Sequence, residues 1–82
     1  RDLSRRELAR LRELVQWRDD VAREIDRATF RVIGNESLLE LARVAPRTAA
    51  DLSRIKGFPR GMTESRQVAL LAALRRGDAV PD

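Results

Sequence analysis

The chain has 82 residues, the size of one small domain, and a formal net charge of +4 at pH 7. It contains no cysteine and no histidine, so disulfides, thiolate metal sites and the usual general base near neutral pH are excluded. Its longest apolar run, residues 68–74, is too short to cross a bilayer. We therefore expect a soluble intracellular domain without metal, cofactor or membrane contact. The start at Arg1 rather than Met predicts a piece of a longer protein.

A long amphipathic helix is predicted from about residue 4 to residue 27, because apolar residues recur there at three- and four-residue steps. Arg18 falls at the centre of the apolar stripe and Trp17 at its edge. We expect Arg18 to pair with a carboxylate or a helix C-terminus; the alternative is a stripe that opens onto a ligand. We expect Trp17 in the core, with base stacking or a partner contact as the alternative.

Residues 30–34 interrupt this pattern and predict an extended loop. The loop carries the aromatic Phe30, which Arg27 and Arg31 flank. Phe30 either pins the loop to the core or stacks on an unpaired base, which would contribute about 1–3 kcal/mol. The two arginines slightly favour stacking.

Two shorter helices are predicted next. Asn35 is a good N-cap for the first of them, and Pro46 ends it. Thr48 begins the second, with Asp51 in place of the glutamate of a capping box. Gly57 stands where a left-handed residue would end that helix.

A last helix is predicted over residues 63–76, with an apolar run that covers most of its sides and predicts a central position. Gly77 suits the position after its end, and residues 78–82 read as a disordered tail. These elements predict an all-α fold, a compact bundle of about five helices. They form one domain over residues 1–82, with an ordered core over about 4–77.

The net charge is concentrated in residues 43–66. The basic residues of this stretch, opposed only by Asp51 and Glu64, are Arg43, Arg47, Arg54, Lys56, Arg60 and Arg66. Such a patch suggests a polyanion, with phosphate as the first candidate. The turn over residues 55–61 either offers backbone N–H groups to phosphate or is a plain corner between helices, and Pro59 weakens the first reading because it has no N–H.

No catalytic constellation is visible. The hydroxyl residues have no histidine to activate them, and the four glycines are isolated rather than gathered in a phosphate-binding loop. Most carboxylates lie on charged helix faces. We therefore expect no catalytic residue and no metal site in this chain.

A series of residues along the chain matches a known pattern. Its members are residues 14–18, Ala22, residues 30–32, Asn35, Leu38, Leu41, Ala42, residues 46–48, Leu52, Ile55 and Gly57. In their order and spacing they resemble the HRDC domain, the helicase and RNase D C-terminal module, over residues 7–77. The resemblance implies a non-catalytic five-helix bundle found in RecQ-type DNA helicases and in RNase D.

The resemblance also implies nucleic-acid contacts. Phe30 matches the loop aromatic that stacks in some members, and Lys56 and Arg60 match basic residues before the last helix. Many relatives have Gly-x-Gly in that turn, where this chain has residues 57–59, Gly-Phe-Pro. Contacts to DNA should therefore depend on side chains.

The resulting hypothesis is an accessory DNA-binding domain of a bacterial RecQ-type ATP-dependent helicase, a cytoplasmic, nucleoid-associated monomer that binds single-stranded or partly duplex DNA. Two alternatives stay open: a module that docks on the catalytic core of the same chain, and an RNA-binding tail of an RNase D-type exonuclease. The candidate nucleic-acid-binding residues are Lys56, Arg60, Arg54, Phe30, Arg31, Arg27, Arg66 and Arg47.

Overall fold

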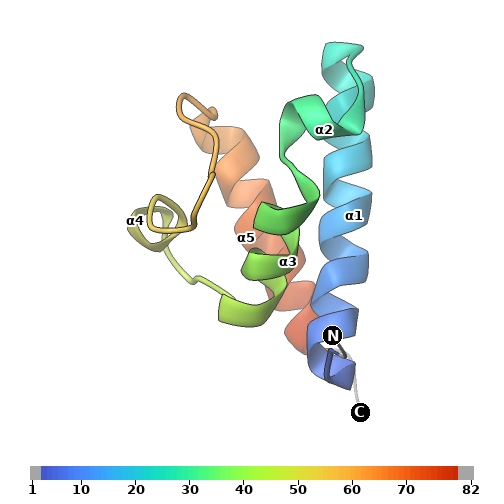
Figure 1. Cartoon of the computed structure of the whole chain (residues 1–82), viewed down its shortest axis with the longest axis vertical. Coiled ribbons are helices and arrows are strands. Elements are labelled where there is room, and N and C mark those ends of the chain that lie inside the picture. Colours follow the sequence, from blue (N-terminus) through green and yellow to red (C-terminus); the bar gives the residue numbers. More distant parts are fainter. Residues whose placement is uncertain (1–2, 80–82) are drawn as a thin grey trace.

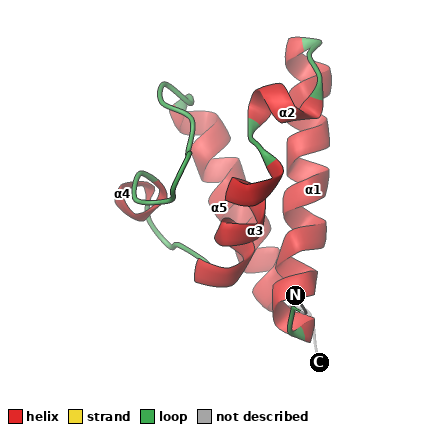
Figure 2. Ribbon diagram, viewed as in Figure 1, coloured by secondary structure: helices red, strands yellow, loops and turns green. Residues whose placement is uncertain are grey.

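The computed structural model describes residues 3–79, and all regular secondary structure in that part of the chain is helical (Figure 2). The helices are α1 (Arg5–Ile25), α2 (Thr29–Val32), α3 (Asn35–Val44), α4 (Ala49–Leu52) and α5 (Glu64–Ala79) (Figure 1). The predicted all-α bundle of about five helices is therefore confirmed. The antiparallel pair of α1 and α5 forms the most extensive helix contact, and α1 also packs on α2 and α3.

Helix α1 has clear signals at both ends. The Ser4 hydroxyl accepts a hydrogen bond from the Glu7 N–H (3.1 Å), and the Ser4 N–H donates to the Glu7 carboxylate (2.9 Å), which completes a capping box. At the other end Asp26 adopts a left-handed conformation with φ of 56°. The prediction of one long first helix is confirmed to within two residues at each end.

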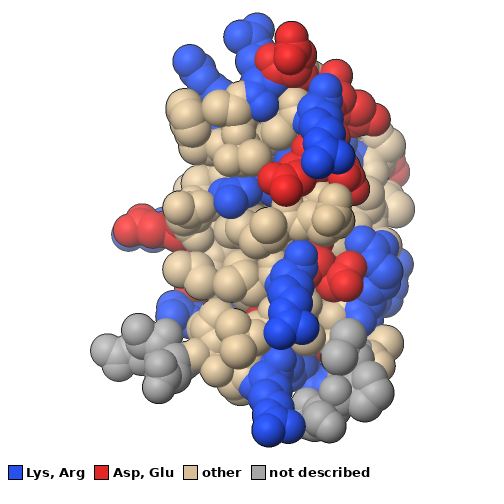
Figure 3. Space-filling model, turned by 90° about the vertical axis from the view of Figure 1, so that its right-hand side faces the viewer, with Lys and Arg blue, Asp and Glu red and all other residues tan. Residues whose placement is uncertain are grey.

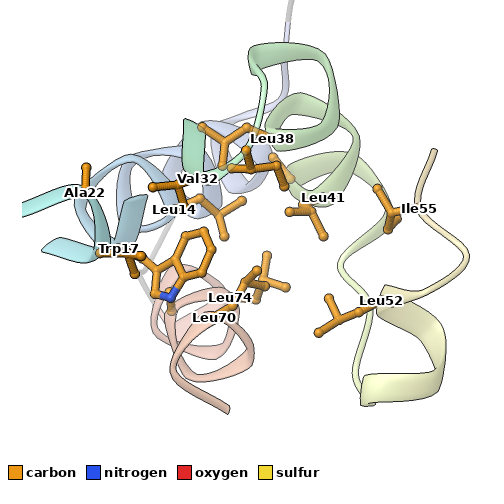
Figure 4. Packing of buried hydrophobic residues seen from close by; sticks show 14 residues of the cluster. Leu14, Trp17, Ala22, Val32, Leu38, Leu41, Leu52, Ile55, Leu70 and Leu74 are labelled. Atoms are coloured by element: carbon orange, nitrogen blue, oxygen red, sulfur yellow. The ribbon is translucent and has the colours of Figure 1, made fainter. Parts of the chain in front are cut away.

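The core is a single apolar cluster to which every helix contributes (Figure 4). Its largest fully buried side chains, one from each of α1, α3, α4 and α5, are Leu14, Leu41, Leu52 and Leu70. Trp17 joins the same cluster with only 4% of its surface exposed, and its Nε1–H donates to the Arg66 carbonyl (3.3 Å). The core position predicted for Trp17 is confirmed.

Helix α5 differs from its prediction in position and length. Helix α5 buries one face and leaves Val68 56% exposed. The helix that makes the most contacts with other helices, and is therefore the central one, is α1. Gly77 does not follow the helix but lies inside it, where an added Cβ would come within 2.5 Å of the Arg10 Cα. The prediction of a central position was wrong because the apolar run covers more sides of α5 than a single packing partner can bury.

The predicted tail is wrong where the structure describes it. Asp78 and Ala79 continue α5, and the Asp78 carboxylate accepts a hydrogen bond from the Arg10 Nε–H (2.6 Å). This ion pair extends the helix past the predicted stop because it ties the last turn to α1. Residues 80–82 lie outside the described residues.

Two of the predicted boundary features are only partly right. Thr48 does cap α4 and accepts from the Asp51 N–H (3.2 Å), but α4 is a single turn. Gly57 has the expected positive φ of 77°, yet it lies five residues beyond Leu52 and shapes the following turn instead of ending α4. Pro46 follows directly after the left-handed Ala45 that ends α3, as predicted.

Candidate nucleic-acid interface

Phe30 lies on a helical turn rather than in an extended loop, so that prediction is wrong. Residues 29–32 form α2, which is anchored by the buried Val32 and by Ile33 just after it. Two residues span about 200° of a helix, so the burial of Val32 turns Phe30 outward. The ring is 68% exposed and does not pin α2 to the core, while the Arg31 guanidinium lies 5.8 Å from the ring centroid. An exposed aromatic ring with an adjacent cation has the chemistry of a base-stacking platform.

The surroundings of Arg27 are electrically mixed. Arg27 and Arg23 line a shallow groove of about 490 Å³ together with the carboxylates of Asp19 and Asp26. Two positive and two negative side chains leave this groove without a charge surplus. Figure 3 shows basic and acidic side chains next to each other in the upper part of its face. Arg27 is therefore exposed near α2 but is not part of a basic patch.

The connector over residues 53–63 carries Arg54, Lys56 and Arg60 on its surface, all exposed. Its backbone is held in place at several points: the Ser37 hydroxyl donates to the Lys56 carbonyl (2.8 Å), and the Gln67 side chain donates to the Met62 carbonyl (2.8 Å). Phe58 and Met62 are partly buried and pack against the core. The connector thus presents three exposed cationic side chains on an anchored backbone.

Lys56 has acidic neighbours as well as a basic one. It lines a groove of about 460 Å³ with Arg43, Glu36 and Glu40. Figure 1 shows the connector in the same half of the molecule as α2, with α2 next to α1 and the connector leading into α5. Arg27 and Lys56 line separate grooves, so the candidates on these two segments do not form one continuous pocket.

Arg66 and Arg47, the remaining two candidates, lie elsewhere. The Arg66 guanidinium is 3.5 Å from the Glu24 carboxylate, and its backbone carbonyl accepts from Trp17, so this residue bridges α1 and α5. Arg47 lines a groove with Asp78 at the opposite end of the bundle. The basic stretch 43–66 is therefore not one corner of the molecule, because the fold distributes its charges over three places.

Arg18 is paired at a helix C-terminus, one of the two kinds of partner expected, because Ile33 is the C-cap residue of α2. Its Nη1 donates to the Ile33 carbonyl (3.2 Å) and to the Asn35 side-chain oxygen (2.8 Å), so both acceptors are neutral. Asn35 is the first residue of α3 and Gly34 takes the N-cap position, so the predicted cap is wrong. The Asn35 amide oxygen is engaged by Arg18 instead, and together these residues fasten the α2–α3 link to α1.

The basic group around Arg47 contains residues that the sequence did not single out: Arg6, Arg10 and Arg75. They are far apart in the chain, and only the antiparallel pairing of α1 with α5 brings them together. Within residues 3–79 no group of three or more acidic side chains is arranged to hold a metal ion. None of the helices described there combines the length and apolar character needed to span a bilayer.

Comparison with known proteins identifies the family. Residues 7–74 match the family model of the HRDC domain. A protein of Granulibacter bethesdensis named ribonuclease D is 39% identical over 80 residues, which are 96% of this chain and 20% of that protein. A ribonuclease D of Gluconacetobacter diazotrophicus is 36% identical over 83 residues, which cover 100% of this chain and 21% of the relative. The chain thus spans about a fifth of the length of these relatives, and no solved structure matches it significantly. With the helical bundle described above, the match to the family model establishes that the chain belongs to the HRDC domain family.

Proposed function

We propose that this HRDC domain is a non-catalytic RNA-binding module of a ribonuclease D-type enzyme. The observation that carries the proposal is the exposed Phe30 ring beside Arg31, on a helical turn anchored by buried neighbours. The names of the curated relatives favour RNase D as the parent over the RecQ-type helicase that the sequence first suggested. The parent activity itself stays a proposal because the chain covers only about a fifth of those relatives.

In the proposed complex an unpaired base stacks on Phe30 while the strand's phosphates meet cationic side chains. Arg31 stands next to the ring, and Arg54, Lys56 and Arg60 are exposed on the connector that leads into α5. Because the connector backbone is anchored by Ser37 and the packed Phe58, little backbone ordering is needed on binding. The small net charge of +4 predicts weak, salt-sensitive binding.

DNA binding in a RecQ-type helicase is the second candidate. It is favoured by the same exposed ring, because base stacking and phosphate contacts do not require a 2′-hydroxyl. RNA and DNA oligonucleotides of one sequence, compared at matched salt, separate the two. Docking on the catalytic core predicts instead that Arg60→Glu leaves nucleic-acid affinity unchanged but alters the activity of the full-length enzyme.

Binding of a labelled 20-nucleotide single-stranded RNA is expected to weaken as salt rises, with a log–log slope of about −2 to −3. This range follows from three or four phosphate contacts at roughly −0.7 each. Fluorescence anisotropy at several salt concentrations measures the slope. Absence of binding at low salt and high micromolar protein would overturn the proposed function.

Phe30→Ala is expected to reduce RNA affinity by about 5- to 150-fold, from the roughly 1–3 kcal/mol of a lost base stack. The salt slope should stay the same because no charge is removed. Val68→Ala is the matched control, because Val68 is also an exposed apolar side chain but lies on α5 instead of α2. Phe30→Tyr should retain binding. Equal affinities for Phe30→Ala and Val68→Ala would show that the ring does not take part.

A further inference from the structure

A groove of about 460 Å³ lies at the end of the bundle where α1 begins, the α3–α4 link passes and α5 ends. It is lined by Arg6, Arg10, Arg47, Arg75, Asp78 and Ala79. Four of these lining residues are arginines, and Asp78 is the one carboxylate among them.

The groove is assembled by the fold from distant parts of the chain. Arg6 and Arg10 come from α1 and Arg75 from α5, and these arginines lie in stretches, residues 1–42 and 67–82, whose basic and acidic residues balance. Only Arg47 belongs to the charge-rich stretch 43–66. Gathering like charges costs free energy through their repulsion, and a bound anion offsets that cost.

The four arginines are held to different degrees. Arg10 is fixed, with 15% of its side chain exposed: its Nε donates to the Asp78 carboxylate (2.6 Å) and its Nη1 to the Ala42 carbonyl (2.9 Å). Arg6 donates to the Asp78 carbonyl. Arg47 and Arg75 are exposed and form no hydrogen bond or ion pair with other side chains of residues 3–79. The groove thus combines a fixed Arg10–Asp78 ion pair with two exposed cations that are able to meet a ligand.

We propose that this groove binds phosphate groups, with the exposed Arg47 and Arg75 as the contacting side chains beside the fixed Arg10. A guanidinium presents paired N–H donors that match two phosphate oxygens. A second hollow, of about 180 Å³, shares Arg47, Arg75 and Asp78 and continues the surface toward Pro46. The ligand class is therefore a phosphate anion that lies across the α3–α4 link and the last turns of α5.

The source of the phosphate is the RNA backbone, an identification that rests on the proposed function. Helix α1 has 21 residues and is about 30 Å long at 1.5 Å per residue, and it separates this groove from α2 and Phe30. A stacked strand advances about 3.4 Å per nucleotide, so roughly nine nucleotides reach from one end to the other. A 20-nucleotide RNA is long enough to occupy both.

The test uses Arg75→Gln and the double variant Arg47→Gln/Arg75→Gln, with Arg12→Gln as the matched control. Arg12 is an exposed arginine on α1 that does not line the groove, and glutamine and arginine have similar helix propensities. With the 20-nucleotide RNA, the salt slope is expected to become shallower by about 0.7 for the single variant and about 1.4 for the double variant. Arg12→Gln should leave the slope unchanged.

A second arm detects phosphate binding without RNA. Pyrophosphate is titrated while the Nε–H resonances of the arginines are followed by NMR, and those of Arg10, Arg47 and Arg75 are expected to shift. The shifts should disappear in the double variant, whose helical circular dichroism confirms that it is folded. A poly-glutamate peptide, titrated in the same way, tests whether the groove binds an acidic protein segment instead of phosphate.

Each result supports or overturns the proposed phosphate site or the proposed function. A shallower slope together with pyrophosphate shifts supports the groove as a contact for the RNA backbone. Pyrophosphate shifts in a wild-type protein that binds no RNA support the phosphate site but refute the proposed function. RNA binding with an unchanged slope and no pyrophosphate shift overturns the groove and leaves the function standing. Shifts with poly-glutamate alone overturn it in favour of a protein partner.

Discussion

Gly77→Ala is expected to lower the free energy of unfolding by about 1–3 kcal/mol, although alanine normally stabilises a helix interior by about 1 kcal/mol relative to glycine. The added Cβ would lie 2.5 Å from the Arg10 Cα and 2.8 Å from the Arg10 N. Both are backbone atoms, so the clash is relieved only if α5 moves away from α1. That movement would disturb the most extensive helix contact of the bundle and the Arg10–Asp78 ion pair.

Urea denaturation followed by circular dichroism measures this loss. Gly34→Ala is the matched control, because no atom lies within 4 Å of the Cβ it would add and its φ of −75° suits alanine. A domain of this length has a total stability of about 4–12 kcal/mol, so the expected change is a large fraction of it. A Gly77→Ala protein as stable as the wild type would show that α1 and α5 do not approach this closely.

Trp17→Ala is expected to cost about 3–5 kcal/mol, the largest loss from any single truncation considered for this chain. The indole is 4% exposed, belongs to the central cluster and donates its Nε1–H to the Arg66 carbonyl on α5 (Figure 4). Removing it leaves a cavity between α1 and α5 and abolishes the hydrogen bond to the Arg66 carbonyl. Thermal and urea unfolding by circular dichroism measure the loss.

Trp17→Phe separates the two contributions. Phenylalanine retains most of the apolar volume but has no N–H, so a loss of about 1–2 kcal/mol is expected. If Trp17→Ala costs less than about 1 kcal/mol, the indole is not the core residue that its burial indicates.

Local signals in the sequence were enough to predict most helix boundaries. Ser4, Pro46 and Thr48 act through their own backbone geometry or through a neighbour three residues away, so their effects could be inferred without the fold. The stripe that includes Leu14 likewise specified which face of α1 is buried. The HRDC resemblance followed from the order of such residues.

Features that depend on contacts between distant segments could not be predicted. Gly77 has the pattern of a helix end, and only the approach of Arg10 explains why glycine is needed inside the helix. Asn35 would be a good cap, but Arg18 occupies its side-chain oxygen. Phe30 was a candidate from the sequence alone, whereas its exposure depends on the burial of Val32 against the core.

The candidate site was harder to predict than the fold for the same reason. Counting charges along the chain pointed to residues 43–66. In the fold, however, Arg66 forms an ion pair with Glu24, and Arg47 lies at the other end of the bundle. Arg10 and Arg75 lie in stretches that are neutral in sequence, but the antiparallel helices place them side by side around one groove. A linear charge count therefore misses clusters that the pairing of helices creates.

The burial of Trp17 gives the domain an internal optical reporter. Trp17 is the only tryptophan and the chain has no tyrosine, so its fluorescence reports on the α1–α5 interface alone. A buried indole is not available to an incoming base, so a bound oligonucleotide changes the unfolding midpoint rather than adding a stacking signal of its own. Ligand at one hundred times its dissociation constant stabilises the folded state by about 2.7 kcal/mol. Unlabelled RNA and pyrophosphate can therefore be ranked by one urea titration each.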